Sequence, residues 1–266
     1  MEKINYLKKL TKNYRKEIWT KFVHAINDFE MITENDKIAV CISGGKDSMI
    51  LALCFMELQK HRQKNFSLEF ITMDPGYKTK DLDKIKENAK ILGIDLKIFK
   101  SDIFEIVKKH GENDPCYLCA RMRRGHLYNY AKELGCNKIA LAHHQNDVNE
   151  TILLNMFYNG AYKSMLPKLK STNFSNMELI RPLYYVNEED IVKYIKSCQL
   201  SFIDCACDSI KLKEGKRAEI KNLIKELKKT NKDIEKNIYK SSTNVLLNTV
   251  IGYQKDNQAF NFLDDY

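Results

Sequence analysis

Five short apolar runs, separated by stretches of helical periodicity, constrain the fold of this chain more than any other feature of its sequence. The runs cover Ile38–Ile42, Leu68–Met73, Leu96–Phe99, Ile139–Ala142 and Leu179–Leu183, and the helical stretches lie near 48–60, 80–92, 117–134, 147–158 and 188–198. Apolar runs of this length that hardly alternate with polar residues are typical of strands buried on both faces. Because strands and helices alternate along the chain, the sequence predicts an α/β fold, with a parallel five-stranded sheet and helices on both of its faces.

Helical segments extend this α/β core at both ends of the chain. Four apolar residues of the N-terminal part recur at helical spacing and predict an amphipathic helix over residues 12–30: Ile18, Phe22, Ile26 and Phe29. The region after Asp208 is rich in lysine and also keeps apolar residues at helical spacing, whereas residues 255–266 show no strong pattern and suggest a loose tail. We therefore expect three parts: an N-terminal helical segment over 1–33, a central α/β domain over 34–208, and a lysine-rich C-terminal helical region with its tail over 209–266.

The charge of the chain is compatible with a polyanionic partner. Its 266 residues include 44 Lys and Arg against 35 Asp and Glu, a formal net charge of +9. RNA is one such partner, although a lysine-rich solvated surface accounts for the charge equally well. No apolar run approaches the roughly 20 residues that a membrane-spanning helix needs. Because the N-terminus is charged throughout and lacks an apolar signal-peptide core, we expect a cytoplasmic protein that does not associate with membranes.

Six residues with two adjacent glycines stand between the first apolar run and the next helical stretch: Ser43, Gly44, Gly45, Lys46, Asp47 and Ser48. Glycine lets the backbone turn sharply and bring its N–H groups close to a ligand. The positive end of the following helix dipole points to the same place, which favours an anion such as phosphate. The segment has neither the G-x-x-x-x-G-K-[ST] spacing of the nucleoside-triphosphatase P-loop nor the G-x-G-x-x-G of dinucleotide-binding folds. We therefore predict a phosphate-binding loop of another type.

The hexapeptide SGGKDS resembles the pyrophosphate loop of the PP-loop ATP pyrophosphatases, a group with the adenine nucleotide alpha-hydrolase-like fold. Four further stretches sharpen the resemblance: DPCYLCARMRRGHLY (114–128), KIALAHHQNDVNETILLNMFYNG (138–160), MLPKL (165–169) and LIRPLYYVNEEDI (179–191). Together and in this order, they resemble the bacterial tRNA 2-thiocytidine synthetase (TtcA) family, from about residue 12 to residue 245.

This resemblance implies an ATP-dependent tRNA sulfurtransferase. Such an enzyme adenylates the C2 oxygen of a cytidine, expected at position 32 of tRNA, and replaces this oxygen with sulfur, releasing AMP and pyrophosphate. The resemblance implies ATP and Mg²⁺ as cofactors, with the β,γ-phosphates held by the loop Ser43–Ser48 and with Asp47 as a catalytic residue. It also implies tRNA as a partner and a cysteine desulfurase or another sulfur donor, and it leaves a homodimer open.

Eight cysteines are an unusual number for a chain expected in a reducing compartment. Clustered thiols in such a compartment indicate a metal site more than a disulfide framework. Cys116 and Cys119 form a C-x-x-C at a predicted boundary between a loop and a helix, and three arginines just beyond would favour the thiolate form. Cys205 and Cys207 supply a second pair. By spacing alone, these four thiols fit a zinc site as well as an iron–sulfur cluster.

The family resemblance implies a [4Fe–4S] cluster held by Cys116, Cys119 and Cys205, which thereby become catalytic residues. In the family the third ligand belongs to a C-x-x-C, whereas this chain reads FIDCACDS at 202–209, so the choice between Cys205 and Cys207 stays open. The other four cysteines lie within or beside strand and helix patterns, and we expect them to be small apolar fillers: Cys41, Cys54, Cys136 and Cys198.

Residues at the predicted strand ends are further candidates, since an open parallel sheet binds its ligands at the carboxyl ends of the strands. Met73 ends the second apolar run and is placed to contact adenine through its backbone. His143 follows the fourth run, where the resemblance supports a role beside the nucleotide or magnesium. The family has G-H-H-R-D-D here and this chain has AHHQND, so Asn146 replaces one acidic residue while Asp147 remains. Six cations could supply phosphate contacts to RNA: Arg121, Arg123, Arg124, Lys163, Lys168 and Lys170.

Two other functions remain compatible with the sequence. A PP-loop ligase that joins a non-sulfur nucleophile to a tRNA cytidine, of the lysidine synthase type, shares the loop but does not need the cysteines. A non-catalytic protein that binds a nucleotide and a metal would keep both the loop and the cysteines.

Overall fold

The computed structural model describes residues 5–104, 106, 115–203 and 215–265. The chain divides into two compact units, which are described one at a time. Unit 1 consists of Met1–Val148 and Leu166–Gly215, and unit 2 consists of Asn149–Met165 and Lys216–Tyr266. Among the described residues, no helix is both long enough and apolar enough to cross a membrane.

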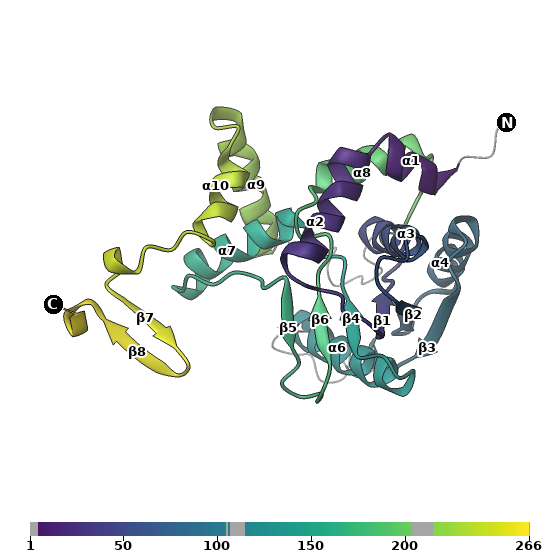
Figure 1. The fold of residues 1–266 in the computed structure, drawn as a ribbon, viewed down its shortest axis with the longest axis horizontal. Coiled ribbons are helices and arrows are strands. Elements are labelled where there is room, and N and C mark those ends of the chain that lie inside the picture. The colour runs from purple at the N-terminus through teal and green to yellow at the C-terminus, as the bar shows by residue number, and fades with distance from the viewer. Residues whose placement is uncertain (1–4, 105, 107–114, 204–214, 266) are drawn as a thin grey trace. The chain divides into compact units, whose positions relative to one another are not determined.

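Unit 1 is built on a six-stranded sheet in the order β3-β2-β1-β4-β6-β5 (Figure 1). Its strands are β1 (Asp36–Cys41), β2 (Phe66–Asp74), β3 (Leu96–Lys100), β4 (Lys138–Ala140), β5 (Lys168–Lys170) and β6 (Glu178–Ile180). The neighbours from β3 to β6 all pair in parallel, which confirms the predicted parallel sheet. The predicted number of five strands is wrong, because β5 adds a sixth, antiparallel strand at the edge. This strand has one apolar residue between two lysines and therefore shows no apolar run.

Helices cover both faces of this sheet, as predicted. The helices of this unit are α3 (Lys46–Lys60), α4 (Thr79–Leu92), α6 (Pro115–Glu133), α8 (Glu188–Ser197) and the first residues of α7 (Gln145–Asn159). Helix α6 packs on one face, where Tyr128 shares a buried cluster with Ala39 and Cys41 of β1. Side chains alternate along a strand, so Ile38 and Val40 point to the opposite face, where α3 lies against β1 and β2.

The N-terminal segment packs onto the helices of unit 1. In place of the single helix predicted over 12–30, it forms α1 (Tyr6–Lys12), a π-helical turn (Arg15–Trp19) and α2 (Thr20–Asp28). The predicted apolar face is nevertheless buried: Phe22 packs edge-on against Phe55 of α3, with 5.5 Å between the ring centroids. The periodicity identified the buried side but not the change of helix type.

Charged residues join the amino ends of the central strands, at the edge of the sheet away from their carboxyl ends. The ammonium of Lys138, at the start of β4, lies 3.0 Å from the Asp36 carboxylate of β1 and 3.1 Å from the Glu178 carboxylate of β6. It also donates a hydrogen bond of 2.9 Å to the carbonyl of Met31. Lys138 and Asp36 are both buried, so this network is part of the core.

Unit 2 contains the second part of α7, the helices α9 (Lys216–Thr230) and α10 (Ile234–Ser241), and a hairpin of β7 (Gly252–Lys255) and β8 (Gln258–Asn261). The two helices confirm the predicted helical region. The expected loose tail is wrong, because its residues form most of the hairpin. Asp256 and Asn257 have φ of 52° and 64°, the positive values that a tight two-residue hairpin turn requires. Tyr253 and Phe260 then stack across the strands at 4.8 Å.

Candidate nucleotide-binding site

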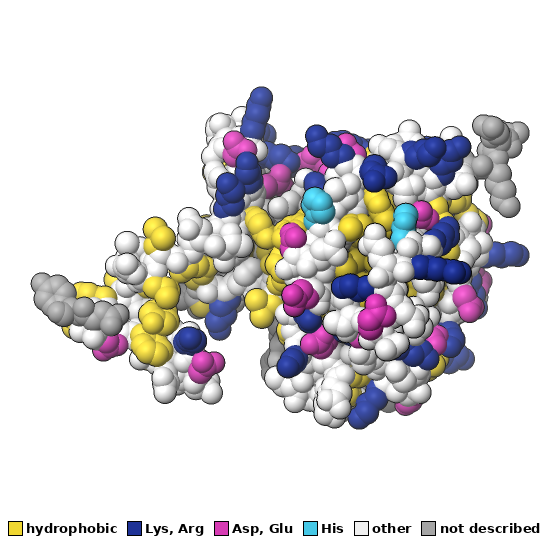
Figure 2. All heavy atoms as spheres, in the orientation of Figure 1, with side chains coloured by type: hydrophobic (Ala, Val, Ile, Leu, Met, Phe, Trp, Pro, Cys, Tyr) yellow, Lys and Arg dark blue, Asp and Glu magenta, His cyan; other side chains and the backbone are white. Residues whose placement is uncertain are grey.

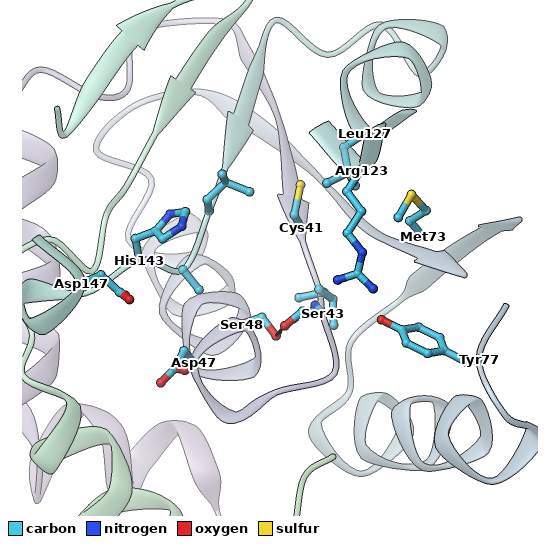
Figure 3. A pocket seen from close by; sticks show the side chains of 13 residues that line it. Cys41, Ser43, Asp47, Ser48, Met73, Tyr77, Arg123, Leu127, His143 and Asp147 are labelled. Carbon is cyan, nitrogen blue, oxygen red and sulfur yellow. Dashed lines mark hydrogen bonds between the residues drawn. The ribbon is translucent and has the colours of Figure 1, made fainter. Parts of the chain in front are cut away.

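A pocket of about 280 Å³ lies at the carboxyl ends of β1, β2 and β4 in unit 1. Figure 3 shows the side chains that line it, and they come from four parts of the unit. The first part is the glycine loop after β1, the second is α6, the third is the segment that joins β4 to α7, and the fourth is the end of β2 with the turn after it. This is the sheet edge at which the sequence predicts ligand binding. Of the predicted site residues, the structure brings Ser43, Asp47, Ser48, Met73 and His143 together here.

The glycine loop has a backbone shape that depends on Gly44. This residue has φ of +86°, and a Cβ placed on it would lie 2.6 Å from Ile85 and 2.7 Å from Ile203. The hydroxyl of Ser48 accepts a hydrogen bond of 3.2 Å from the N–H of Ser43 and donates one of 2.9 Å to the carbonyl of Gly45. Within the described part of the chain, no side chain caps the start of α3. Its first N–H groups are therefore available to an anionic ligand.

Lys46 and Asp47 play different parts at the start of α3. The ammonium of Lys46 lies 3.2 Å from the Asp47 carboxylate and 3.1 Å from that of Glu188. Burial by itself lowers the pKa of Lys46, but these two carboxylates outweigh the effect and raise the pKa above its usual value. The other carboxylate oxygen of Asp47, Oδ1, is buried without a hydrogen-bond partner among the described residues. An unsatisfied carboxylate oxygen beside a phosphate-binding loop fits a divalent cation such as Mg²⁺.

Helix α6 forms the second wall of the pocket and carries the C-x-x-C. Cys119, Arg123 and Leu127 are four residues apart and so lie on one face of this helix, and the last two line the pocket. Arg123 Nε is buried and has no hydrogen-bond partner among the described residues, so it can donate to an anion bound there. The half-buried Cys119 lies in the first turns, where the helix dipole favours a thiolate. Cys116 occupies the first turn, but the structure describes only its backbone.

The remaining cysteines fall into two groups. Cys205 and Cys207 lie outside the described residues. Cys41, Cys54, Cys136 and Cys198 are buried, which confirms their prediction as small core residues, although Cys41 also lines the pocket. Burial raises the pKa of the Cys41 and Cys54 thiols, and it raises that of Cys136 to about 11. Among the described residues, no group of three or more His, Cys, Asp and Glu side chains is arranged to hold a metal.

The third wall is organised by Arg181, which directly follows β6. Its Nε donates a hydrogen bond of 3.3 Å to Nδ1 of His143. Since Nδ1 accepts, a neutral His143 carries its proton on Nε2 and can donate from that atom. Arg181 is largely buried, and this burial, with the nearby charge of Arg124, lowers its pKa to about 10. A buried guanidinium of this kind is stabilised when an anion binds nearby.

The neighbours of His143 have structural partners in unit 1. His144 is buried, and its backbone N–H donates a hydrogen bond of 3.0 Å to the carboxylate of Asp147. Asn146, which stands where the family has an acidic residue, accepts 2.9 Å from the backbone N–H of Glu188 at the start of α8. The predicted RNA contact Lys168 donates to the carbonyl of Glu30 at 2.8 Å and so helps to hold the edge strand.

Two residues of the site were missed in the sequence. Tyr77 lines the pocket, and Figure 3 shows its hydroxyl directed toward the glycine loop. The Asp74 carboxylate accepts from its N–H at 2.8 Å and fixes the turn after β2, for which the letters DPGY were the signal. Arg181 was the other, and its position directly after the last apolar run was the signal.

Comparisons with known proteins identify the family and the fold of this chain. A family model of the PP-loop domain, ATP_bind_3, matches residues 14–227. The chain is 40% identical over 248 residues to a protein of Bdellovibrio bacteriovorus named tRNA-cytidine(32) 2-sulfurtransferase, covering 91% of this chain and 92% of that one. A protein of the same name from Alcanivorax borkumensis is 39% identical over 246 residues, covering 90% and 83%. The fold is similar to that of the U34-tRNA thiolase NcsA from Methanococcus maripaludis with its [4Fe–4S] cluster. The TM-score is 0.69 at 23% identity, with 89% of this chain and 80% of that chain covered.

Proposed function

Because this chain belongs to the PP-loop family of tRNA-cytidine(32) 2-sulfurtransferases, we propose that it uses ATP to replace the C2 oxygen of cytidine 32 in tRNA with sulfur. The observation that carries the proposal is the composition of one pocket. The glycine loop and the helix with the C-x-x-C form two of its walls, which supports a site where phosphate binding and sulfur chemistry lie close together.

In this proposal the loop binds the β,γ-phosphates of ATP. The N–H groups of Gly45 and of the first turn of α3 donate to phosphate oxygens, and Asp47 Oδ1 holds Mg²⁺. Arg123 and the Nε2–H of His143 face the same space and stabilise negative charge on the phosphate that reacts. Met73 and Tyr77 line the part of the pocket next to β2, where the adenosine fits.

The chemistry needs two substitutions. In the first, the C2 oxygen of cytidine forms a bond to the α-phosphorus of ATP, and pyrophosphate leaves with the electrons of the broken P–O bond. In the second, a sulfur atom adds to C2, and AMP leaves with the former C2 oxygen. Adenylation is required because a carbonyl oxygen is a poor leaving group, whereas AMP is a good one. The target base must leave its stack to reach the pocket, which costs about a few kcal/mol.

We propose that Cys116, Cys119 and one cysteine of the Cys205–Cys207 pair hold a [4Fe–4S] cluster. The described part of the donor set fits, since the soft thiol of Cys119 lies near the positive end of α6, on the face that also carries Arg123. When bound by three cysteines, such a cluster supplies an iron with an open position for sulfur. The chain itself contributes the electrostatic environment, because α6 and its arginines favour the thiolate form.

The same proposal covers the partners and the compartment. The sulfur is expected from a cysteine desulfurase or another sulfur donor, the protein works in the cytoplasm beside its tRNA substrate, and a homodimer is compatible with this chemistry. None of the roles above requires a second copy of the chain.

Nucleoside mass spectrometry tests the proposed function. Protein purified without oxygen is incubated with ATP, Mg²⁺, sulfide and tRNA that lacks the modification, and we expect 2-thiocytidine at position 32 together with released pyrophosphate. The Asp47→Ala variant should form neither product. The control variant Asp83→Ala, on the exposed side of α4, should form both. Pyrophosphate release without thiolation would favour a ligase with another nucleophile. Absence of both products with the wild-type protein would contradict the proposal.

A further inference from the structure

We infer that the basic face of α9 and α10 in unit 2 binds the phosphate backbone of the tRNA substrate, an inference that rests on the proposed function. We call this face the lysine surface, and six exposed lysines define it: Lys221, Lys225, Lys229, Lys232, Lys236 and Lys240. Because a tRNA extends far beyond the one base that is modified, a surface outside the pocket can contribute to its binding.

The segment that carries the lysine surface holds more than half of the formal net charge of the protein. From Lys216 to Ser241 the chain has nine Lys and Arg and four Asp and Glu, an excess of five, against +9 for all 266 residues. Figure 2 shows Lys and Arg side chains, with acidic side chains among them, over the part of the molecule that Figure 1 labels α9 and α10. Such a concentration repels itself in the folded protein and is stabilised by a polyanion.

In each of the two helices the lysines of this surface are exposed while isoleucines are buried. In α9, Ile220 and Ile224 are buried, whereas Lys221, Lys225 and Lys229 are exposed and four residues apart, so they form a row along the helix. A row of this spacing advances about 6 Å per lysine. Lys236 and Lys240 repeat the four-residue interval on α10, where Ile238 is the buried residue, and Lys232 lies in the turn just before this helix.

Most acidic groups on these helices are engaged with groups other than Lys225, Lys232 and Lys236. Glu226 pairs with Lys229 at 2.6 Å, Glu235 pairs with Lys228 at 2.5 Å, and Glu219 accepts a hydrogen bond from the hydroxyl of Tyr158. Among the described residues, Lys225, Lys232 and Lys236 have no carboxylate within ion-pair distance. Their charges are therefore available to phosphates.

Exposed aromatic rings border the lysine surface within unit 2. The side chain of Phe157 is 57% exposed, and those of Tyr158 and Tyr162 are also exposed. The ammonium of Lys216 lies 4.8 Å from the ring centroid of Tyr158, and the hydroxyl of Tyr162 donates 2.9 Å to Ser241 at the end of α10. Aromatic rings among cations are typical of RNA-binding surfaces, because bases stack on the rings while the cations contact phosphates. This combination favours RNA over an acidic protein.

Fluorescence anisotropy with a tRNA transcript tests the inference. The variant K225Q/K232Q/K236Q is compared with K12Q/K16Q/K90Q, which removes the same charge from exposed lysines of unit 1. We expect the first variant to bind about 10- to 100-fold more weakly at 100 mM salt, with a log–log salt slope that is smaller by about 2 to 3. The unit 1 variant should stay within about threefold of wild type, and both variants should keep the wild-type thermal transition.

The other outcomes distinguish a failure of the inference from a failure of the proposed function. Wild-type affinity of the first variant, or equal losses in both variants, would remove the lysine surface from RNA binding and leave the proposed function standing. A wild-type protein that binds no tRNA would overturn both, and binding to vesicles of anionic lipid instead would indicate a membrane surface. Weaker tRNA binding by the first variant, in a protein that forms no 2-thiocytidine, would keep the lysine surface and overturn only the proposed function.

Discussion

Single residues set the shape and chemistry of the pocket. Gly44 allows the loop to pass between Ile85 and Ile203, and Arg181 selects the tautomer of His143. Each of these residues acts through one atom-scale property: a missing Cβ, or an N–H at a defined position. Substitutions at such positions should therefore affect ligand binding more than the stability of the fold.

Gly44→Ala should abolish ATP binding, whereas Gly45→Ala should weaken it only slightly. An alanine at position 44 needs a left-handed conformation, at about 1–2 kcal/mol, and its Cβ would overlap Ile85 and Ile203. At position 45 the nearest atom to a new Cβ is Ser43 Oγ at 3.6 Å, an ordinary contact. Titration calorimetry with a non-hydrolysable ATP analogue measures both affinities. Equal affinities of the two variants would show that the loop tolerates a side chain at position 44.

Arg181→Met should loosen His143 without unfolding the protein. In the wild type, ¹⁵N NMR should find the proton of neutral His143 on Nε2, because Nδ1 accepts from Arg181. The variant should show a mixture of both tautomers and weaker ATP binding. Burial and Arg124 lower the pKa of Arg181 to about 10, so below that pH its charge lowers stability and its removal costs little beyond two hydrogen bonds. Arg121→Met, at an exposed position of α6, is the control. An unchanged His143 spectrum in Arg181→Met would show that Arg181 does not select the tautomer of His143.

Four cysteine variants should divide by their iron content after anaerobic purification. Cys116→Ser, Cys119→Ser and Cys205→Ser should lose iron and sulfide, because each removes a proposed ligand, and Cys207→Ser should retain both. Cys54→Ser, in the core of α3, is the control for a thiol that holds no metal. If Cys207→Ser loses iron and Cys205→Ser keeps it, the assignments of these two cysteines are exchanged. Stoichiometric zinc without iron in the wild type would exclude the cluster.

At the scale of elements, the carboxyl ends and the amino ends of the central strands have different functions. The carboxyl ends of β1, β2 and β4 border the pocket, and the amino ends of β1, β4 and β6 are held by the Asp36–Lys138–Glu178 network. Helix α6 contributes to both the core and the pocket, since Tyr128 packs on the sheet while Arg123 lines the pocket. The stability of unit 1 can therefore be changed at one edge without altering the site at the other.

Asp36→Asn should lower the free energy of unfolding by about 3 kcal/mol at pH 7, because it leaves buried Lys138 without one of its charge partners. Burial alone raises the pKa of Asp36, but the Thr33 N–H, Asn137 and Lys138 outweigh it and lower the pKa. A carboxyl with a lowered pKa stabilises the fold above its unfolded value of about 4 and loses this contribution as the pH falls through its folded value. The difference between wild type and variant, measured by urea denaturation, should therefore shrink below pH 4. Glu57→Gln, at a surface ion pair, is the control, and a pH-independent difference would contradict the assignment.

At the scale of the whole molecule, the protein consists of two compact units with different chemistry. Unit 1 contains the pocket, and unit 2 contains the lysine surface and the C-terminal hairpin. Helix α7 contributes residues to both, so neither unit is a continuous segment of the chain.

An ATP analogue should therefore stabilise unit 1 selectively in a calorimetric unfolding experiment. A ligand present at 100 times its dissociation constant adds about 2.7 kcal/mol, which raises the midpoint of a domain of this size by roughly 5–10 °C. The transition of unit 1 should shift by this amount, and that of unit 2 should stay in place. Gly44→Ala is the control and should show no shift. A single transition that moves as a whole would show that the two units unfold together.

Local patterns in the sequence were sufficient for the elements and for part of the site. The strands, the covering helices, the buried side of the N-terminal helices and the glycine loop were all predicted, because each depends on residues that are close in the chain. The edge strand β5 and the hairpin were not predicted, since one leucine between two lysines and a turn of Asp256 and Asn257 leave almost no hydrophobic pattern.

Only the tertiary structure decided which distant residues meet. Asp36 and Lys138 lie on strands that are neighbours through a crossover, and Arg181 reaches His143 from the end of β6, the neighbour of β4 in the sheet. The face of α6 that points to the pocket likewise depends on how Tyr128 packs against β1. Such contacts follow from strand order, register and helix packing. These are set by the burial of the whole core, so no short stretch of sequence contains them.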